Sequence, residues 1–160
     1  MSTIIKVIIP AYNEEKSIGK VIDDIPPIVN EIIVVNNNST DATERVAKTA
    51  GATVVNELKR GYGHACLKAM SYISLQQTKA DIIVFLDGDY SDYPEQLTQL
   101  IAPIIEKDID LIVMGSHWVN GFKELFIGSN TEKVVRTANI PVLVIKNEHT
   151  DFNIKDFVFG

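Results

Sequence analysis

Two aspartates separated by one glycine, Asp87-Gly88-Asp89, are the residues of this sequence best suited to chemistry. They follow directly on the apolar run Ile82–Leu86, which has the length and composition of a buried strand. Two carboxylates at this spacing can converge on one hard cation, and Gly88 lets the backbone turn without a side chain in the way. Mg²⁺ or Mn²⁺ held there would bridge to a diphosphate and neutralise charge as a phosphate leaving group departs. The alternative is that these acidic residues simply end a strand.

The elements that position this turn alternate along the chain in a regular way. Short β-branched runs predict strands at Ile4–Ile9, Glu31–Val35, Thr53–Val55, Ile82–Leu86, Leu111–Met114 and Val142–Ile145. Helical patterns lie between them at Glu15–Asp24, Thr40–Ala50, Gly63–Gln76, Pro94–Glu106 and Ser129–Ala138. This alternation predicts an α/β fold, a single doubly wound, mostly parallel sheet of six strands with helices on both faces. Ligands of such folds bind at the carboxyl ends of the strands, where polar residues follow nearly every predicted strand here.

Composition excludes several classes of function. A net charge of −6 argues against broad contact with nucleic acid, because phosphate binding needs clustered Lys and Arg. Cys66 is the single cysteine, so an internal disulfide is excluded and the chain suits a reducing cytosol. No apolar run approaches the roughly 20 residues that span a bilayer, and the start has no secretory pattern. We therefore expect a cytoplasmic protein that could still visit a membrane surface.

Four segments in order carry a resemblance to a known family. They are Val7-Ile-Ile-Pro-Ala-Tyr-Asn-Glu14, Glu31-Ile-Ile-Val-Val-Asn-Asn-Asn-Ser-Thr-Asp41, Arg60-Gly-Tyr-Gly63 and Phe85-Leu-Asp-Gly-Asp-Tyr-Ser-Asp-Tyr-Pro-Glu95. Together they resemble the family 2 glycosyltransferases, and most closely the polyprenol-phosphate sugar transferases, from about Thr3 to Asp110. The resemblance implies a GT-A fold that binds a UDP- or GDP-linked sugar with a divalent metal. It also implies transfer of the sugar to a polyprenyl phosphate at a membrane surface or to another acceptor.

The same resemblance assigns roles to residues of this chain. Pro10, Tyr12 and Glu14 would hold the nucleoside, Gly61 and Gly63 would let the backbone approach the nucleotide, and Asp87 and Asp89 would form the diphosphate–metal pair. Where the family usually has Asp-Asp-Gly-Ser-Thr-Asp, with an aspartate reaching the base, this sequence has Asn36-Asn-Asn-Ser-Thr-Asp41. Asn37 could still accept a hydrogen bond from the base through its amide oxygen. The acceptor half of the family should begin near Gly115, where this sequence departs from the pattern, so the catalytic base is unassigned.

From Asp110 to Lys146 the chain is similar instead to the C-terminal unit of the universal stress proteins. In that family a strand-end glycine and a later Gly-Ser pair wrap the phosphates of ATP, which places Gly115, Gly128 and Ser129 at such a site. Trp118 stands where the pattern has a second glycine, and this bulky side chain argues against a close approach of phosphate. The alternative is that Ser129 only caps the helix that follows it.

These two resemblances divide the chain into a glycosyltransferase-like segment (1–110), a stress-protein-like unit completing the same sheet (111–146) and a tail (147–160). The leading hypothesis is metal-dependent binding of a nucleotide sugar, with weak or absent transfer because the acceptor half is missing. A second hypothesis is a module that binds ATP or a partner, and a third is a folded chimera without activity. The predicted edge Val142–Ile145 and the apolar tail favour self-association as a homodimer.

Overall fold

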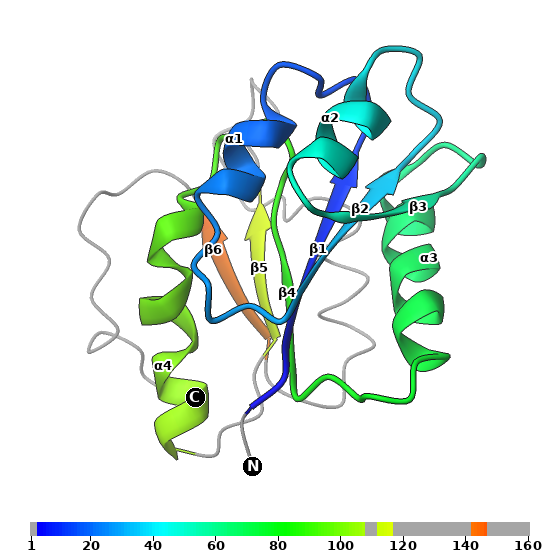
Figure 1. Ribbon diagram of the computed structural model, residues 1–160. Helices are drawn as coiled ribbons and strands as arrows, with labels where there is room; N and C mark the ends of the chain where they lie inside the picture. Colours follow the sequence, from blue (N-terminus) through cyan, green and yellow to red (C-terminus); the bar gives the residue numbers. More distant parts are fainter. Residues whose placement is uncertain (1–2, 108–111, 117–141, 147–160) are drawn as a thin grey trace, which may run out of the picture.

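A computed structural model of the chain describes residues 3–107, 112–116 and 142–146 (Figure 1). Its strands are β1 (Ile5–Ala11), β2 (Glu31–Asn36), β3 (Thr53–Asn56), β4 (Ile82–Phe85), β5 (Ile112–Ser116) and β6 (Val142–Lys146). Its helices are α1 (Ile18–Asp23), α2 (Thr43–Thr49), α3 (Tyr62–Ser74), the short 3₁₀ helix η1 (Pro94–Gln96) and α4 (Leu97–Lys107). The predicted helix at Ser129–Ala138 and the tail 147–160 lie outside the described residues, as do Gly128, Ser129 and Trp118.

The first four strands form one parallel sheet in the order β3-β2-β1-β4. β1 lies at the centre, with Lys6 opposite Glu31 of β2 and Val7 opposite Val84 of β4. The chain winds from β1 through β2 to β3 and then crosses back to add β4 on the other side of β1. The strand order therefore reverses between β1 and β4, and in open parallel sheets this is the place where ligands bind. The predicted parallel α/β fold is confirmed.

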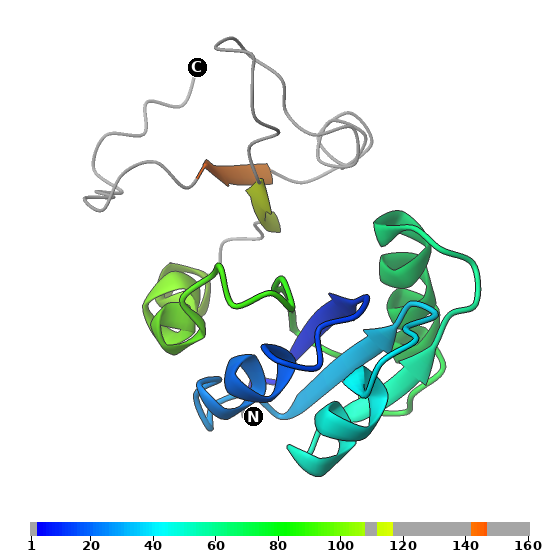
Figure 2. The same cartoon turned by 90° about the horizontal axis from the view of Figure 1, so that it is seen from above.

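The last two strands differ from the prediction of a single six-stranded sheet. β5 and β6 pair with each other in parallel, from Ile112 opposite Val142 to Ser116 opposite Lys146, and form a two-stranded sheet of their own. β5 contacts β4 but is not paired with it, and Figure 2 shows β5 and β6 beside the four-stranded sheet. Apolar, β-branched runs identify strands but carry little information about which neighbour each strand will choose.

Both faces of the four-stranded sheet are covered, and the alternation along β1 shows how. Ile5, Val7 and Ile9 point into a core formed with α1, α2 and α4. Ile8 points to the opposite face, where it packs with Ala65, Ala69 and Ile73 of α3. A strand that is apolar on both faces needs helices above and below it, and β1 is apolar on both faces from Val7 to Ile9.

Within the described ranges, the structure has no helix with both the length and the apolar character needed to cross a bilayer.

Candidate functional site

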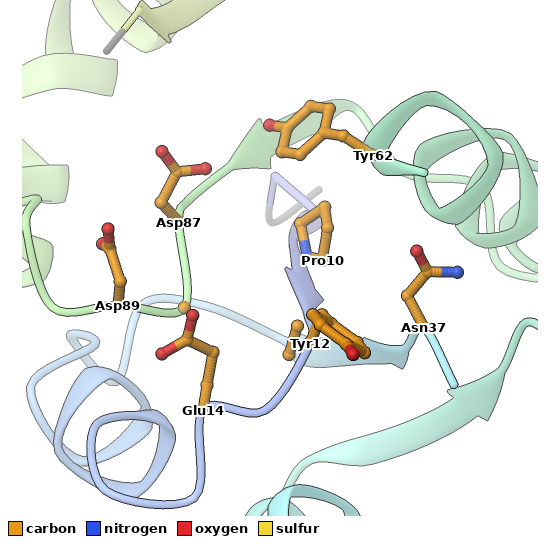
Figure 3. A pocket seen from close by; sticks show the side chains of 9 residues that line it. Pro10, Tyr12, Glu14, Asn37, Tyr62, Asp87 and Asp89 are labelled. Carbon is orange, nitrogen blue, oxygen red and sulfur yellow. The ribbon is translucent and has the colours of Figure 1, made fainter. Parts of the chain in front are cut away.

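A cavity of about 310 Å³ opens at the carboxyl ends of β1 and β4, where the strand order reverses. Figure 3 shows its walls. The lining residues are Pro10, Ala11, Tyr12, Glu14, Asn37, Tyr62, Asp87, Gly88 and Asp89. They come from the ends of β1, β2 and β4 and from the first residue of α3. Four segments far apart in the sequence therefore meet at one place.

The cavity brings together most of the residues that the sequence singled out, but not all of them. Gly61 precedes α3 and reaches the cavity wall through a hydrogen bond from its N–H to Asn37 Oδ1 (2.7 Å). Gly63 lies in the first turn of α3, and Gly115 lies in β5; neither lines the cavity.

The acidic turn after β4 is held in shape by its own side chains. The backbone N–H of Asp87 donates to Asp92 Oδ2 at 2.9 Å. Asp89 Oδ1 accepts from both the N–H and the hydroxyl of Ser91, at 3.0 and 2.6 Å. Tyr90, with φ of 65° in the left-handed region, donates its hydroxyl to Asp24 at the end of α1. Ser91 and Asp92 therefore position the turn that presents Asp87 and Asp89 to the cavity.

The carboxylates of this turn suit a small divalent cation whose coordination sphere is completed by a bound ligand and water. Within the described residues, no group of three or more His, Cys, Asp or Glu side chains could hold a metal ion by itself. Asp87 and Asp89 both line the cavity, however, and Figure 3 shows their carboxylates on the same side of it. Mg²⁺ is commonly bound through one or two carboxylates, with substrate phosphates and waters as its other ligands. Two carboxylates beside a cavity suit that mode of binding.

The segment Ser39-Thr40-Asp41, in the loop after β2, is hydrogen-bonded to the loop after β1. Asp41 accepts from the Thr43 N–H at 3.0 Å and from the Glu15 N–H at 3.1 Å. Burial alone would raise the pKa of Asp41, but the hydrogen bonds from the hydroxyl and N–H of Thr43 and from the N–H of Glu15 outweigh it and lower that pKa. The N–H of Thr40, in the loop after β2, donates to Asn13 Oδ1, in the loop after β1, at 2.8 Å. These bonds place Tyr12 and Glu14 relative to β2.

A second loop, residues 57–61, is fastened to the end of β2 by Asn37. This side chain is buried, and its Nδ2 donates to the carbonyl oxygens of Glu57 (3.2 Å) and Lys59 (2.8 Å) while its Oδ1 accepts from Gly61. The guanidinium of Arg60, in the same loop, lies 4.6 Å from the centroid of the Tyr12 ring, within the range of a cation–π contact. Asn37 therefore helps to place Arg60 beside Tyr12, which lines the cavity.

Tyr62 is a cavity residue that the sequence analysis did not name. Burial raises the pKa of its hydroxyl well above the usual range, and nearby Cys66, Asp87 and Asp92 act in the same direction, so the hydroxyl keeps its proton. Burial, opposed by the hydrogen bond with Tyr62 and assisted by Asp87, raises the pKa of the Cys66 thiol to about 11. A protonated thiol is a poor nucleophile, so Cys66 has no catalytic character here. The sequence signal for Tyr62 is its position between the two glycines of Arg60-Gly-Tyr-Gly63, directly before the predicted helix.

Comparison with known proteins identifies the family. The model of the Glycosyl transferase family 2 matches residues 6–155. The chain belongs to this family. It is 38% identical over 119 residues to Protein RfbJ of Shigella flexneri, an alignment that covers 73% of this chain and 88% of RfbJ. It is 36% identical over 131 residues to the glucosyl-3-phosphoglycerate synthase of Mycolicibacterium paratuberculosis, covering 74% of this chain and 36% of the synthase.

A solved structure of a family 2 enzyme has the same fold. The Mycobacterium tuberculosis glucosyl-3-phosphoglycerate synthase in complex with Mn²⁺, UDP and phosphoglyceric acid superposes with a TM-score of 0.59 at 32% identity. The match covers 71% of this chain and 43% of the synthase, so this chain spans less than half of that enzyme. The family 2 match also continues through the junction at residue 110. These relatives give no support to a stress-protein unit or to the polyprenol-phosphate type, and both resemblances stay predictions.

The close packing around Gly88 leads to a prediction about the stability of the turn between Asp87 and Asp89. A Cβ added to Gly88 would lie 3.4 Å from Glu14 Cγ and 3.5 Å from both Ile9 Cγ2 and Pro10 O. Alanine fits at these ordinary contact distances, whereas the further methyl groups of valine would overpack the turn against β1. We expect Gly88→Ala to keep nearly full stability and Gly88→Val to lose about 1–3 kcal/mol in urea denaturation. Equal stability of the two variants would contradict the packing described here.

Proposed function

We propose that this chain binds a UDP-linked sugar together with Mg²⁺ or Mn²⁺ in the cavity between β1 and β4. One observation carries the proposal: Pro10, Tyr12, Glu14, Asn37, Asp87 and Asp89, chosen from sequence as nucleotide or metal residues, all line this one cavity. The complex of the related synthase with Mn²⁺ and UDP supports the choice of ligand. In this proposal the chain supplies the donor-binding part of a glycosyltransferase.

In this proposal, different residues of the cavity contact different parts of the ligand. Pro10, Tyr12 and Glu14 would surround the nucleoside, and Asp87 and Asp89 would hold the cation beside the diphosphate. The cation, when bound, neutralises charge on the nucleoside diphosphate as it leaves the sugar. Ser91 keeps Asp89 in position through two hydrogen bonds to Oδ1, so the carboxylate stays oriented before the ligand arrives. Tyr62, which keeps its proton, lines the same cavity.

The acceptor in this proposal carries a phosphate group. The related synthase has been crystallised with phosphoglyceric acid, while the sequence resembles transferases that use a polyprenyl phosphate. Release of UDP from UDP-glucose, measured with phosphoglyceric acid and separately with polyprenyl phosphate in detergent, distinguishes these acceptors. Transfer with neither would restrict the function to donor binding.

Thermal unfolding in the presence of nucleotides tests the binding step. We expect UDP with Mn²⁺ to raise the melting temperature by several degrees, because a ligand at 100 times its Kd adds about 2.7 kcal/mol to the free energy of unfolding. Mn²⁺ alone should add little, since Asp87 and Asp89 leave most of its coordination sphere to the diphosphate and water.

The matched conditions are UDP with EDTA, GDP with Mn²⁺ and ATP with Mn²⁺. A shift with UDP that disappears in EDTA supports the proposal. An equal shift with UDP in EDTA would contradict the metal assignment, and a shift with ATP alone would move nucleotide binding away from this cavity.

A further inference from the structure

We infer that Asn37 is a positioning residue for the cavity, a clasp that holds loop 57–61 closed, rather than a residue that reads the nucleotide base. The inference rests on the proposed function, because Arg60 of this loop contacts Tyr12 of the proposed nucleotide site and Tyr62, which follows the loop directly, lines that site. The aspartate that the family usually carries near this position would perform the clasp poorly. The observations that carry the inference are the three hydrogen bonds of one buried amide.

The amide of Asn37 is matched to the loop atom by atom. An Asn side chain has two N–H donors and one carbonyl oxygen. Both donors face carbonyl oxygens of the loop, those of Glu57 and Lys59, and the oxygen faces the N–H of Gly61. The side chain is 6% exposed, so water has little access to replace these partners. Its hydrogen-bonding geometry is complementary to the loop.

The clasp lies next to two groups of interest, Arg60, which contacts Tyr12, and Tyr62, which lines the cavity. Gly61 has φ of 129°, a conformation that L side chains rarely adopt, and its N–H is directed to Asn37. The residue before it, Arg60, lies over Tyr12, and the residue after it, Tyr62, begins α3 and lines the cavity. Opening the clasp would therefore displace Arg60 and Tyr62 together.

An aspartate at position 37 would reverse part of this match. One carboxylate oxygen would replace Nδ2 and face the carbonyl oxygens of Glu57 and Lys59, which offer no proton. Burial and this repulsion would make the charged form unfavourable, so acid would protonate the carboxyl and restore one donor. Asn37→Asp is therefore expected to open the loop at neutral pH and to close it partly at acid pH.

The test uses full-length Asn37→Asp, Asn37→Ala and, as the matched control, Asn38→Asp. Asn38 is exposed and has φ of 61°, a conformation that aspartate tolerates, so Asn38→Asp adds the same charge one residue away without touching the loop. Two readouts are measured: tryptic cleavage after Lys59 and Arg60, which are both exposed, and affinity for UDP with Mn²⁺.

At about pH 8 we expect faster cleavage at these two bonds in both Asn37 variants and about tenfold weaker UDP binding. For Asn37→Asp the loss should shrink toward about pH 5, whereas for Asn37→Ala it should not. Other titratable groups lie around the clasp and give a background pH dependence: Glu57, Lys59, Arg60, Tyr12, Glu14, Tyr62 and Asp87. The wild type, Asn37→Ala and Asn38→Asp keep all of them and report that background.

The outcomes separate the clasp from the proposed function. If Asn37→Asp binds UDP as tightly as the wild type at about pH 8, the residue acts as a base acceptor and the clasp is refuted. If Asn37→Ala is cleaved after Lys59 and Arg60 at the wild-type rate, the clasp is also refuted. This result remains decisive even if Asn37→Asp fails to fold. If the wild type binds no UDP, the proposed function fails, while the cleavage readout still decides whether Asn37 holds the loop.

Discussion

Replacing Asp89 by asparagine is expected to abolish the stabilisation of this chain by UDP with Mn²⁺. The asparagine oxygen can still accept from Ser91, so the turn keeps its shape, but the negative charge that attracts the cation is lost. At 100 times the wild-type Kd, the lost stabilisation amounts to about 2.7 kcal/mol, which thermal unfolding measures directly.

The matched control for this variant is Asp23→Asn, which removes an exposed carboxylate from α1 away from the cavity lining. It should keep the full Mn²⁺-dependent shift. An Asp89→Asn protein that is stabilised by UDP with Mn²⁺ as strongly as the control would contradict the metal assignment.

Replacing Glu31 by glutamine is expected to cause the largest loss of fold stability, about 3 kcal/mol. Glu31 lies opposite Lys6, whose ammonium is nearly buried, and the two form an ion pair at 2.8 Å. Tyr72 and Gln76 of the α3 region donate to the same carboxylate at 3.0 and 3.1 Å. Glutamine would leave the Lys6 charge inside the protein without its anionic partner. Urea denaturation of the variant measures the loss.

The control for Glu31 is an exposed ion pair of the same residue types. Glu44 and Lys48 pair at 2.5 Å along α2, with side chains 37% and 57% exposed. Exposed pairs at this helical spacing contribute about 0.3–0.5 kcal/mol, so Glu44→Gln should cost little. If both substitutions lowered the free energy of unfolding equally, burial of Lys6 would not make its ion pair with Glu31 more important than an exposed pair.

The Glu31 carboxylate also makes the stability of the fold depend on pH in the acid range. Burial raises its pKa, but the hydrogen bonds from Lys6, Gln76 and Tyr72 outweigh burial and set the pKa below the ordinary value of 4.5. The stabilisation is therefore fully present above pH 4.5 and disappears as the pH falls through the lowered pKa. Wild type should lose stability in this window faster than Glu31→Gln, and parallel pH profiles would contradict that account.

Much of the fold and the place of the site could be predicted because each depends on local sequence. The run Val7–Ile9 is apolar on both faces, and the structure buries those faces against helices on either side. The acidic turn follows its strand directly, so its position at the carboxyl end of β4 follows from the parallel arrangement. Strand assignment and site location therefore needed no knowledge of distant contacts.

The roles of Asn37, Tyr62 and Asp92 could not be predicted in the same way. The partners of Asn37 lie 20 to 24 residues further along the chain, in a loop whose path depends on how α3 docks against the sheet. Tyr62 reaches the cavity only because α3 begins beside it, and Asp92 turns back to hold Asp87. Residue types supply the chemistry, but these contacts arise from tertiary packing.

The pairing of β5 with β6 is a further limit of sequence patterns. Both strands were expected close to the observed positions, yet they pair with each other and not with the four-stranded sheet. The apolar pattern fixes which residues are extended and which faces are buried, whereas lateral partners depend on the whole chain.

The central claim is that a divalent metal and a nucleotide share the cavity between β1 and β4. Line broadening by substoichiometric Mn²⁺ with UDP in the amide NMR spectrum tests it most directly, with Mg²⁺ and UDP as the diamagnetic reference. We predict that the amide signals of Tyr12, Asn37 and Gly88 broaden first. The amides of Asn30 and Asp81, which bond to Ile5 and Ile4 at the opposite end of the sheet, should stay sharp. Broadening that is strongest at Asn30 and Asp81, or absent from the cavity residues, would contradict the claim.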